Sequence, residues 1–376
     1  MNDLTEIRSQ IDLLDEQMLQ LFEQRMELCD QVAQFKIQNG RKVLDSKREA
    51  EKISKLKAMA HNSFNKHGVE ELFRQIMAMS RKLQYQRLAM EGVTGRLPFV
   101  CVDEIERNNV RVVFQGVEGA YSQAAMEQFF GQDVRSFHVE SWRDAMEAIS
   151  EGTADYAVLP IENSTAGIVS DIYDLLVEFD NYIVGEQVIR IEHALLGTKD
   201  AAIDQIKTVY SHPQGLMQSA EFLHTHPEWA LKELENTAVA AKKVLEDADP
   251  TQAAIAGKQN AHIYGLKVLK CPVNQNTQNF TRFIVVTNQK LYCRNARKVS
   301  ICFELPHESG SLYNILSHFI YNGLNMSKIE SRPIPDRNWE YRFFVDFVGN
   351  LADDGVKNAV RGIAEEALNL RILGNY

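Results

Sequence analysis

Apolar residues in the first part of the chain recur every three or four positions, which is the spacing of one helical face. The pattern predicts a single helix of about 35 residues, ~50 Å long at 1.5 Å per residue. Two shorter helices are predicted at about 45–60 and 67–90, after a turn at Asn39–Gly40. Because three helices without a sheet cannot bury so long an apolar seam, the sequence predicts an intertwined dimer. The seam residues are Leu4, Ile7, Ile11, Leu14, Met18, Leu21, Leu28, Val32 and Phe35.

One position of this seam carries a charge. The spacing from Leu21 to Leu28 places Arg25 where an apolar residue belongs. At ~100° per residue, Lys36 lies about 20° from Arg25 around the helix, and Arg8 about 100° away. Two interpretations stay open: Arg25 reaches solvent from the seam edge, or it serves an anion pocket inside a bundle, where a buried cation needs a negative partner. In the second case, the geometry assigns Arg8 to the pocket of another subunit.

Beyond residue 109 the pattern changes to short apolar runs that alternate with helical stretches. A strand at Val110–Phe114 leads into Gly116–Ser122 and an amphipathic helix, and a second strand at Asp155–Leu159 ends at Pro160–Ser164. Further strands are predicted at 182–197, 206–210, 253–256 and 282–287. This alternation predicts an α/β fold that binds ligands at the carboxyl ends of its strands.

The last ~80 residues show a third pattern, strand–helix–strand–strand–helix–strand, which is typical of ferredoxin-like modules. The predicted elements are Lys298–Leu305, Ser311–Tyr321, Asn325–Ser331, Tyr341–Val348, Gly355–Ala367 and Leu370–Leu373.

Composition marks the boundaries between these regions. All nine prolines lie at or beyond Pro98, and only four of the 20 glycines fall within the first 97 residues. A helical unit therefore ends at a glycine-containing linker near 92–97. We expect three units, at 1–91, 109–290 and 297–376.

Charge excludes some classes of partner. The chain has 41 Lys+Arg and 51 Asp+Glu, a net charge of -10, which argues against a nucleic-acid binder. Residues 1–90 carry 15 basic and 13 acidic side chains, so the remainder has 26 and 38. Small dianions remain possible partners, because a local basic pocket can exist in an acidic protein.

Other features of the sequence bear on its location and on metals. The five cysteines are dispersed and show no metal-ligand spacing, so we expect neither metal nor cofactor. No ~18-residue apolar run and no signal peptide occur, so we expect a cytoplasmic protein without a membrane partner.

The N-terminal unit resembles the all-helical chorismate mutases. Their catalytic step is a pericyclic rearrangement of a dianion, which needs a grip on one conformer and charge stabilisation at the breaking ether oxygen. The resemblance implies that Lys36, Gln84 and Glu49 are catalytic. It also implies that Arg8 of the partner subunit, Arg25, Arg48, Asp45 and Ser80 bind the substrate. The matching motifs are Arg8, Glu23-Gln-Arg25, Lys36, Asp45-Ser-Lys-Arg48-Glu49 and the pair Ser80 and Gln84.

The middle region resembles the two-lobed prephenate dehydratases. The resemblance places Thr281 at the leaving hydroxyl, where hydrogen-bond assistance is a safer description than full proton transfer. It implies that Ser122, Glu162, Asn163, Ser164, Arg282 and Phe283 bind prephenate. Glu162 is either an acid with a pKa raised by burial or a structural partner, and His212 is expected to make a structural or polar contact. The motifs are Gly116-x-x-Gly119-Ala-Tyr-Ser122, Pro160-Ile-Glu-Asn-Ser164, Tyr210-Ser-His-Pro-Gln214 and Asn279-Phe-Thr-Arg-Phe283.

The final unit resembles ACT domains that bind phenylalanine at a dimer interface. The effector signature is Glu330-Ser331-Arg332-Pro333, preceded by Gly310-Ser311-Leu312, in which Ser311 replaces the family's alanine. Together the three resemblances indicate a bifunctional chorismate mutase–prephenate dehydratase with a regulatory domain. Such an enzyme converts chorismate through prephenate to phenylpyruvate, is inhibited by phenylalanine and forms a homodimer or homotetramer.

Two other functions would explain part of the sequence. A mutase joined to a dehydrogenase would need a Gly-x-Gly-x-x-Gly fingerprint, and Gly116-Val-Glu-Gly119 lacks that spacing. A non-enzymatic amino-acid sensor with a dimerisation coiled coil explains the long helix, but leaves Arg25 on the seam unexplained.

Overall fold

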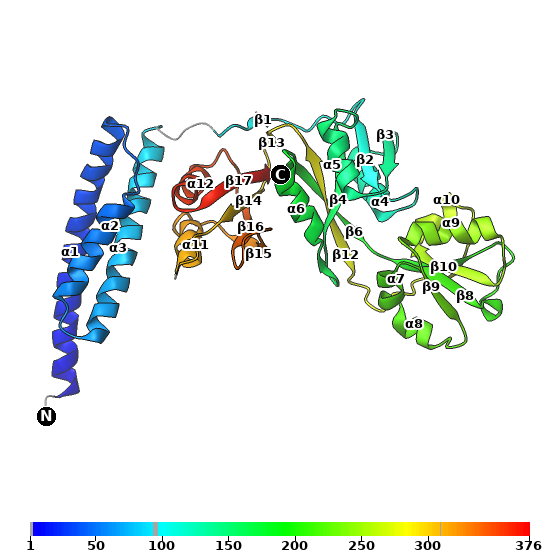
Figure 1. Ribbon diagram of the computed structural model, residues 1–376, viewed down its shortest axis with the longest axis horizontal. Coiled ribbons are helices and arrows are strands. Elements are labelled where there is room, and N and C mark those ends of the chain that lie inside the picture. The colour runs from blue at the N-terminus through cyan, green and yellow to red at the C-terminus, as the bar shows by residue number, and fades with distance from the viewer. Residues whose placement is uncertain (1–2, 93–96, 309) are drawn as a thin grey trace. The chain divides into compact units, whose positions relative to one another are not determined.

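The computed structural model describes residues 3–92, 97–308 and 310–376 (Figure 1). The glycine-containing linker predicted near 92–97 lies largely outside these ranges. The chain forms two compact units, one of residues 1–98 with 297–372 and the other of residues 99–296 with 373–376. The N-terminal helices therefore share a unit with the C-terminal region, although the sequence suggested separate units for them. Within the described ranges, no helix is both long and apolar enough to cross a membrane.

Three helices begin the first unit: α1 (Leu4–Gln38), α2 (Ser46–Met59) and α3 (Ser63–Met90). The predicted length of the first helix is confirmed, because α1 has 35 residues. The side chains of Asp3, Asp45 and Asn62 cap the three N-termini by accepting backbone N–H groups. The third helix begins four residues earlier than predicted, at the residue after its Asn62 cap.

The apolar seam of α1 is largely exposed in the single chain. Leu4, Leu21 and Leu28 keep 59%, 65% and 60% of their surface, and Ala33 is the buried residue of the helix. The three helices of a single chain therefore leave the predicted seam largely uncovered.

The C-terminal part of the first unit has the predicted order of strands and helices. Its sheet has the order β15-β16-β14-β17, and the ends of the elements lie within two residues of most predicted bounds. Arg81 Nε on α3 donates to Glu366 Oε1 of α12 at 2.8 Å, and Tyr85 Oη donates to Glu365 Oε2 at 2.8 Å. The elements are β14 (Lys298–Glu304), α11 (Ser311–Tyr321), β15 (Met326–Pro333), β16 (Tyr341–Val348), α12 (Asp354–Glu366) and β17 (Leu368–Asn375).

The first lobe of the second unit is a mixed sheet of order β6-β12-β4-β2-β3 with helices packed on it. Val112, Phe114, Val158 and Val285 lie in its core. The strands are β2 (Arg111–Gln115), β3 (Arg135–Val139), β4 (Tyr156–Asn163), β6 (Tyr182–Arg190) and β12 (Phe280–Thr287). Short strands β1 (Val100–Val102), β5 (Gly167–Ile168) and β13 (Leu291–Cys293) lie off this path. The helices are α4 (Tyr121–Phe130), α5 (Trp142–Ser150) and α6 (Ser170–Glu178).

Strand β4 corrects the predicted end of the second strand. The sequence suggested that the strand stops before Pro160, but β4 continues to Asn163. It does so because β12 pairs with it antiparallel, with Thr281 opposite Asn163 and Phe283 opposite Pro160. The Pro160–Asn163 motif is therefore held rigidly beside the motif that contains Thr281.

The second lobe is a five-stranded sheet of order β11-β7-β10-β8-β9. The chain enters it between β6 and β7, so the region predicted as one strand at 182–197 belongs to two sheets. Ile191 N donates to Asn279 O at 2.8 Å where the chain passes between the lobes. The strands are β7 (His193–Gly197), β8 (Thr208–Ser211), β9 (Ala230–Glu233), β10 (Gln252–Gly257) and β11 (Lys267–Lys270). The helical elements are η1 (Ile203–Gln205), α7 (Pro213–Gln218), α8 (Ala220–His224), α9 (Thr237–Asp247) and α10 (Gln259–Ile263).

Candidate active sites

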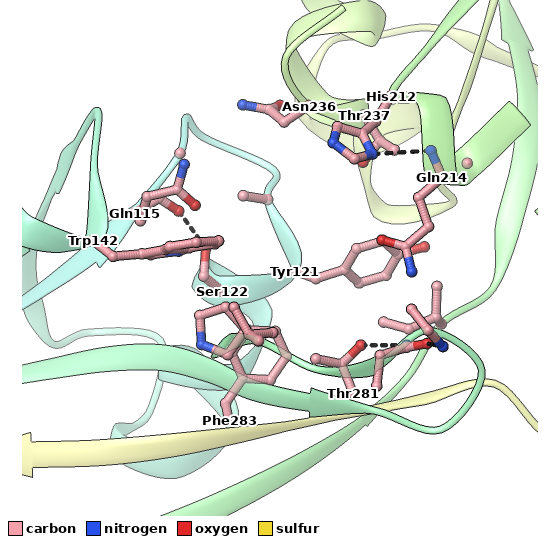
Figure 2. Close-up of a pocket in the computed structure, with 18 of the residues that line it drawn as sticks. Gln115, Tyr121, Ser122, Trp142, His212, Gln214, Asn236, Thr237, Thr281 and Phe283 are labelled. Carbon is pink, nitrogen blue, oxygen red and sulfur yellow. Dashed lines mark hydrogen bonds between the residues drawn. The ribbon is translucent and has the colours of Figure 1, made fainter. Parts of the chain in front are cut away.

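A cavity of about 460 Å³ lies between the two lobes of the second unit. Figure 2 shows Trp142, Ser122 and Phe283 on one side of it and His212, Gln214 and Thr237 on the other. This volume is typical of small-molecule sites. The cavity also lies where the sequence placed a ligand, at the ends of strands.

Helix N-termini surround this cavity. Residues from the first turns of α4 and α6 in the first lobe, and of α7 and α9 in the second, line it. Among the described residues that line the cavity, none is a lysine or an arginine. Backbone N–H groups of first helical turns lack partners within the helix and attract anions. The cavity can therefore hold carboxylates through helix N-termini.

The loop before α4 depends on glycine. Gly119 has φ +87°, and a Cβ atom there would lie 2.0 Å from Asn260 Oδ1 of the second lobe. Asn260 Nδ2 donates to Gly119 O at 3.1 Å. The glycine thus permits a close contact that joins the N-terminal side of α4 to the second lobe.

Thr281 lies in the cavity with its hydroxyl oriented by Asn163. The Asn163 Oδ1 atom accepts from the backbone N–H groups of Thr165 at 3.0 Å and Ala166 at 2.9 Å. Its Nδ2 group must therefore face the other way, and it donates to Thr281 Oγ1 at 2.9 Å. Because Thr281 Oγ1 accepts this bond, its own hydrogen is available to a group in the cavity.

The network continues beyond the residues that the sequence predicted. Asn163 Nδ2 also donates to Asn279 Oδ1 at 2.9 Å, and Asn279 Nδ2 donates to Gln218 Oε1 at 3.0 Å. His193 Nε2 lies 3.0 Å from the same Gln218 oxygen. Asn279 begins a motif that was already recognised, whereas His193 and Gln218 carry no local sequence signal and become neighbours only through the fold.

Ser122, Phe283 and His212 line the cavity as well. The Ser122 hydroxyl donates to Gln115 O at 2.6 Å, so its hydrogen is already used by the backbone. His212 Nδ1 accepts from Gln214 N at 3.1 Å at the start of α7. Burial lowers the pKa of His212, which favours the neutral form that this cap requires.

Three predicted residues lie away from the cavity. Side chains alternate along a strand, so Arg282 and Glu162 point to the opposite face from their neighbours Thr281 and Asn163. Arg282 Nη2 lies 3.3 Å from Glu162 Oε2, and Arg282 Nη1 lies 3.3 Å from Glu186 Oε2. Ser164 Oγ donates to Gln278 O at 3.0 Å and accepts from Phe280 N at 2.9 Å. These placements favour structural roles for all three, and they favour the structural alternative for Glu162.

In the helical part of the first unit, several predicted mutase residues come together. Arg25 is half-buried and donates through Nη1 to Ser80 Oγ. Gln84, one turn further along α3, is buried and donates to Ser80 O at 3.2 Å, while its Oε1 atom has no partner. Such a buried, unpaired carboxamide oxygen needs a donor. Because Arg25 is half-buried and bonded to Ser80, the solvent-exposed interpretation of this residue is disfavoured.

Lys36 lies near a second group of predicted residues. Its Nζ atom donates to Val43 O at 2.5 Å, and Asp45 and Glu49 are close enough to act on its charge. Burial lowers the pKa of Lys36, although the carboxylates oppose this shift. Glu49 Oε2 accepts from Arg81 Nη1 at 2.5 Å. Asp45 Oδ1 caps α2 by accepting from Arg48 N at 3.1 Å.

The single chain does not bring Arg8 into this group, whereas the Arg48 charge is close enough to help lower the pKa of Lys36. Both are exposed. Arg8 precedes Arg25 by 17 positions in the same straight helix, about 25 Å at 1.5 Å per residue. An Arg8 side chain can reach a pocket containing Arg25 only from another copy.

The predicted effector residues occupy two places in the C-terminal sheet and helices. Gly310, at φ +84°, precedes α11, and Ser311 and Leu312 line a cavity of about 340 Å³ with Trp339 and Tyr341. Glu330, Ser331, Arg332 and Pro333 lie on β15, the edge strand of the sheet, and do not line that cavity. A single chain therefore does not gather the two motifs around one cavity.

Across the described parts of the chain, no group of three or more His, Cys, Asp or Glu side chains has the arrangement of a metal site.

Comparison with known proteins identifies the family. The chain is 32% identical over 383 residues to the bifunctional chorismate mutase/prephenate dehydratase of Escherichia coli strain K12, covering 100% of this chain and 96% of that protein. It is 30% identical over 381 residues to the enzyme of the same description from Aquifex aeolicus, covering 100% and 98%. The chain belongs to the family of bifunctional chorismate mutase/prephenate dehydratases. The family models assign its parts, because chorismate mutase type II matches residues 7–85 and prephenate dehydratase matches residues 112–291.

Solved structures are similar over 71% of this chain. A prephenate dehydratase of Arthrobacter aurescens in complex with L-Phe is 30% identical, with a TM-score of 0.66, and the match covers 71% of this chain and 89% of that one. GqqA, described as a novel type of quorum-quenching acylase, is 28% identical with a TM-score of 0.65, covering 71% and 97%. The dehydratase fold is therefore shared with at least one protein that has a different described activity.

Proposed function

We propose that this chain catalyses two consecutive reactions, chorismate to prephenate in residues 1–91 and prephenate to phenylpyruvate in residues 109–290. The observation that carries the second activity is the orientation of Thr281 by Asn163 within the cavity. An O–H hydrogen available to the cavity, helix N-termini for carboxylates and the aromatic side chains of Trp142 and Phe283 together fit prephenate.

In the dehydratase step, the ring carboxylate leaves as carbon dioxide while the ring hydroxyl departs. The electrons of the breaking carbon–carbon bond complete the aromatic ring, and the carbon–oxygen bond breaks with its electron pair on oxygen. The Thr281 O–H donates a hydrogen bond to that oxygen as negative charge develops. No general acid with a raised pKa is needed, because aromatisation supplies much of the driving force.

In the mutase step, the helices bind a dianion in a compact conformer. Arg25, fixed by Ser80, binds a carboxylate, and Lys36 and the Gln84 amide stabilise the ether oxygen. Asp45 and Glu49 hold the ring hydroxyl, and Arg48 turns inward to the substrate. Arg8 enters from a second copy, because it lies too far along α1 to serve its own chain. The exposed seam of α1 supports the homodimer that this arrangement requires.

For residues 297–376 we propose an ACT regulatory domain that binds phenylalanine between two copies. Its two predicted effector motifs do not line one cavity of a single chain, and β15 offers an edge strand to a partner. The L-Phe complex of the Arthrobacter aurescens relative supports this effector. A homodimer is the minimal assembly, and phenylalanine is expected to favour a tetramer.

Turnover assays test each part separately. Purified protein is incubated with chorismate or with prephenate, and phenylpyruvate is followed with and without phenylalanine. Persistence of chorismate while prephenate is consumed would eliminate the mutase, and persistence of both would eliminate the whole proposal. Turnover that is indifferent to millimolar phenylalanine would eliminate the regulatory part.

A second activity is favoured by one comparison, the acylase description of GqqA. Hydrolytic acyl transfer normally uses a hydroxyl activated by a neighbouring base. In this cavity the Ser122 hydroxyl donates to a backbone carbonyl and Thr281 accepts from an amide, and neither bonds to a histidine. We therefore rank this activity second, and incubation with an N-acyl homoserine lactone tests it directly.

A further inference from the structure

His193, a buried residue that itself lines the cavity, is joined to Asn163 and Thr281 by a chain of hydrogen bonds. His193 begins β7 and is 3% exposed, and Asn279, which separates it from the Asn163–Thr281 pair, is 1% exposed. Buried polar groups of this kind are normally satisfied and fixed in orientation. The orientation of each group in the chain can be worked out from backbone donors.

The hydrogen bonds of Thr165 fix the orientation of the Gln218 carboxamide. Its hydroxyl donates to Asn163 Oδ1 at 2.6 Å, an oxygen already identified by the backbone N–H groups of Thr165 and Ala166. Because a hydroxyl has one hydrogen, Thr165 Oγ1 can only accept from Gln218, at 3.1 Å. The Gln218 Nε2 group therefore faces Thr165, and its Oε1 atom faces the opposite way.

The hydrogen bonds of Asn279 lead to the same orientation of Gln218 by a second path that also starts at Asn163. Asn279 Oδ1 accepts from Asn163 Nδ2, so Asn279 Nδ2 must be the group that faces Gln218. It donates to Gln218 Oε1, which confirms that this atom is an acceptor. His193 Nε2 lies 3.0 Å from this acceptor and must carry a hydrogen. In a neutral imidazole the Nδ1 atom is then bare. The Tyr121 hydroxyl lies 3.2 Å from Nδ1 and 3.0 Å from Glu192 O, so its single hydrogen is shared between these two acceptors.

We propose that His193 is a positioning residue of the dehydratase, which acts as the neutral Nε2–H tautomer to hold the Gln218 carboxamide with its N–H₂ group toward the cavity. Gln218 lines the cavity, and one of its two amide hydrogens is used by Thr165. The other can donate to a carboxylate of the substrate. The predicted effect on kcat/KM rests on the proposed dehydratase activity, whereas the predicted tautomer of His193 does not.

The surroundings of His193 agree with a neutral ring. Burial lowers the pKa of His193, and the Gln218 hydrogen bond opposes this shift. Tyr121 from α4 and Gln218 from α7 face the ring, and Asn274 Oδ1 accepts from the His193 backbone N–H at 2.9 Å. The nearby carboxyl group is that of Glu192, whose Oε1 accepts from Cys271 Sγ at 3.5 Å.

Nitrogen NMR of the full chain labelled at histidine tests the tautomer without any substrate. The His193 signal is assigned by its loss in His193→Phe. We expect the neutral Nε2–H ring at pH 8. An Nδ1–H tautomer, or a ring that is charged at that pH, would overturn the proposal.

Kinetics of three variants test the positioning role. We expect His193→Phe to lower kcat/KM for prephenate at least tenfold, chiefly by raising KM, and His193→Gln to recover part of this because its amide can still donate. In a Gln218→Leu background, His193→Phe should add little, since it acts through the missing carboxamide. Multiplicative losses in the double variant, or an unchanged kcat/KM in His193→Phe, would refute the role.

Two controls separate misfolding from positioning. His138 is exposed on β3 and does not line the cavity, so His138→Phe is the matched substitution and should leave kcat/KM unchanged. Mutase turnover of each preparation shows whether the chain is folded. A wild-type protein that leaves prephenate intact would defeat the proposed function, whereas the NMR result would still decide the state of His193.

Discussion

Replacing Asn163 with aspartate keeps the size of the side chain but removes the Nδ2 group, which donates to Thr281 Oγ1, Asn279 Oδ1 and Phe280 O. In the wild type, Asn163 Nδ2 donates to Thr281 Oγ1 at 2.9 Å, which leaves the threonine hydrogen for the substrate. A carboxylate at 163 can only accept, so the Thr281 hydroxyl would turn and donate to it. The leaving hydroxyl would lose its donor, although Thr281 itself is unchanged.

The size of the effect follows from the burial of the pair. Asn163 is 9% exposed, so water cannot readily replace the lost donor. Loss of one preorganised donor at a site of developing charge lowers kcat about 10²–10³-fold, or about 2.7–4 kcal/mol. We expect a fall of this size in kcat for prephenate, together with weaker binding of the dianion because the variant adds a negative charge.

Phenylpyruvate formation from prephenate measures this fall, and chorismate consumption by the same preparation serves as the internal reference. Asn108→Asp, at an exposed site of the same unit, is the matched control for added charge. Because both changes remove the hydrogen that Thr281 donates to the substrate, Asn163→Asp should lower kcat little further in a Thr281→Val background, whereas its added charge should still raise KM. A kcat within threefold of wild type, or losses that multiply in the double variant, would refute the reasoning.

Three further predictions concern the first unit. Arg25→Ala should reduce mutase turnover at least 100-fold with the dimer and the dehydratase intact; unchanged turnover would remove Arg25 from the site. Since burial lowers the pKa of Lys36 below 10.5, mutase activity should fall on the alkaline side before an ordinary lysine would titrate, and Lys36→Arg should abolish that fall whatever its residual rate. Glu366→Gln should destabilise the first unit by about 2 kcal/mol in urea unfolding, because Arg81 is 7% exposed and loses a charged partner. Burial alone would raise the pKa of Glu366, but His318 and Arg81 outweigh it and hold the pKa low. The stability difference between Glu366→Gln and wild type should therefore disappear as the pH falls through that pKa.

Periodicity predicted the helices of the first unit well because apolar residues recur with the helical period there, even though most of this face of α1 is exposed in a single chain. It failed at β3 and β9, whose residues are almost all exposed at the edges of their sheets and show no alternation. The motifs located Thr281, Asn163 and the loop before α4. They could not separate Thr281 from Arg282, because only the pleat of β12 decides which of two neighbours faces the cavity. His193 and Gln218 were beyond prediction, since their contact depends on how the chain passes between two sheets.

The two proposed sites hold carboxylates by different means, and the difference follows from the elements that build them. Three helices in a bundle offer only side chains to their interior, since their backbone N–H groups are used along each helix, so that site depends on Arg25 and Lys36. The two-lobed unit places the first turns of helices from both lobes at one cavity, where backbone N–H groups can replace cationic side chains. A substrate with two carboxylates can then bridge the lobes, with one group at the first turn of α4 and the other at that of α9, away from Asp171 in the first turn of α6. Binding energy from each carboxylate would draw the lobes together around Thr281 and exclude water at the step in which the hydroxyl leaves.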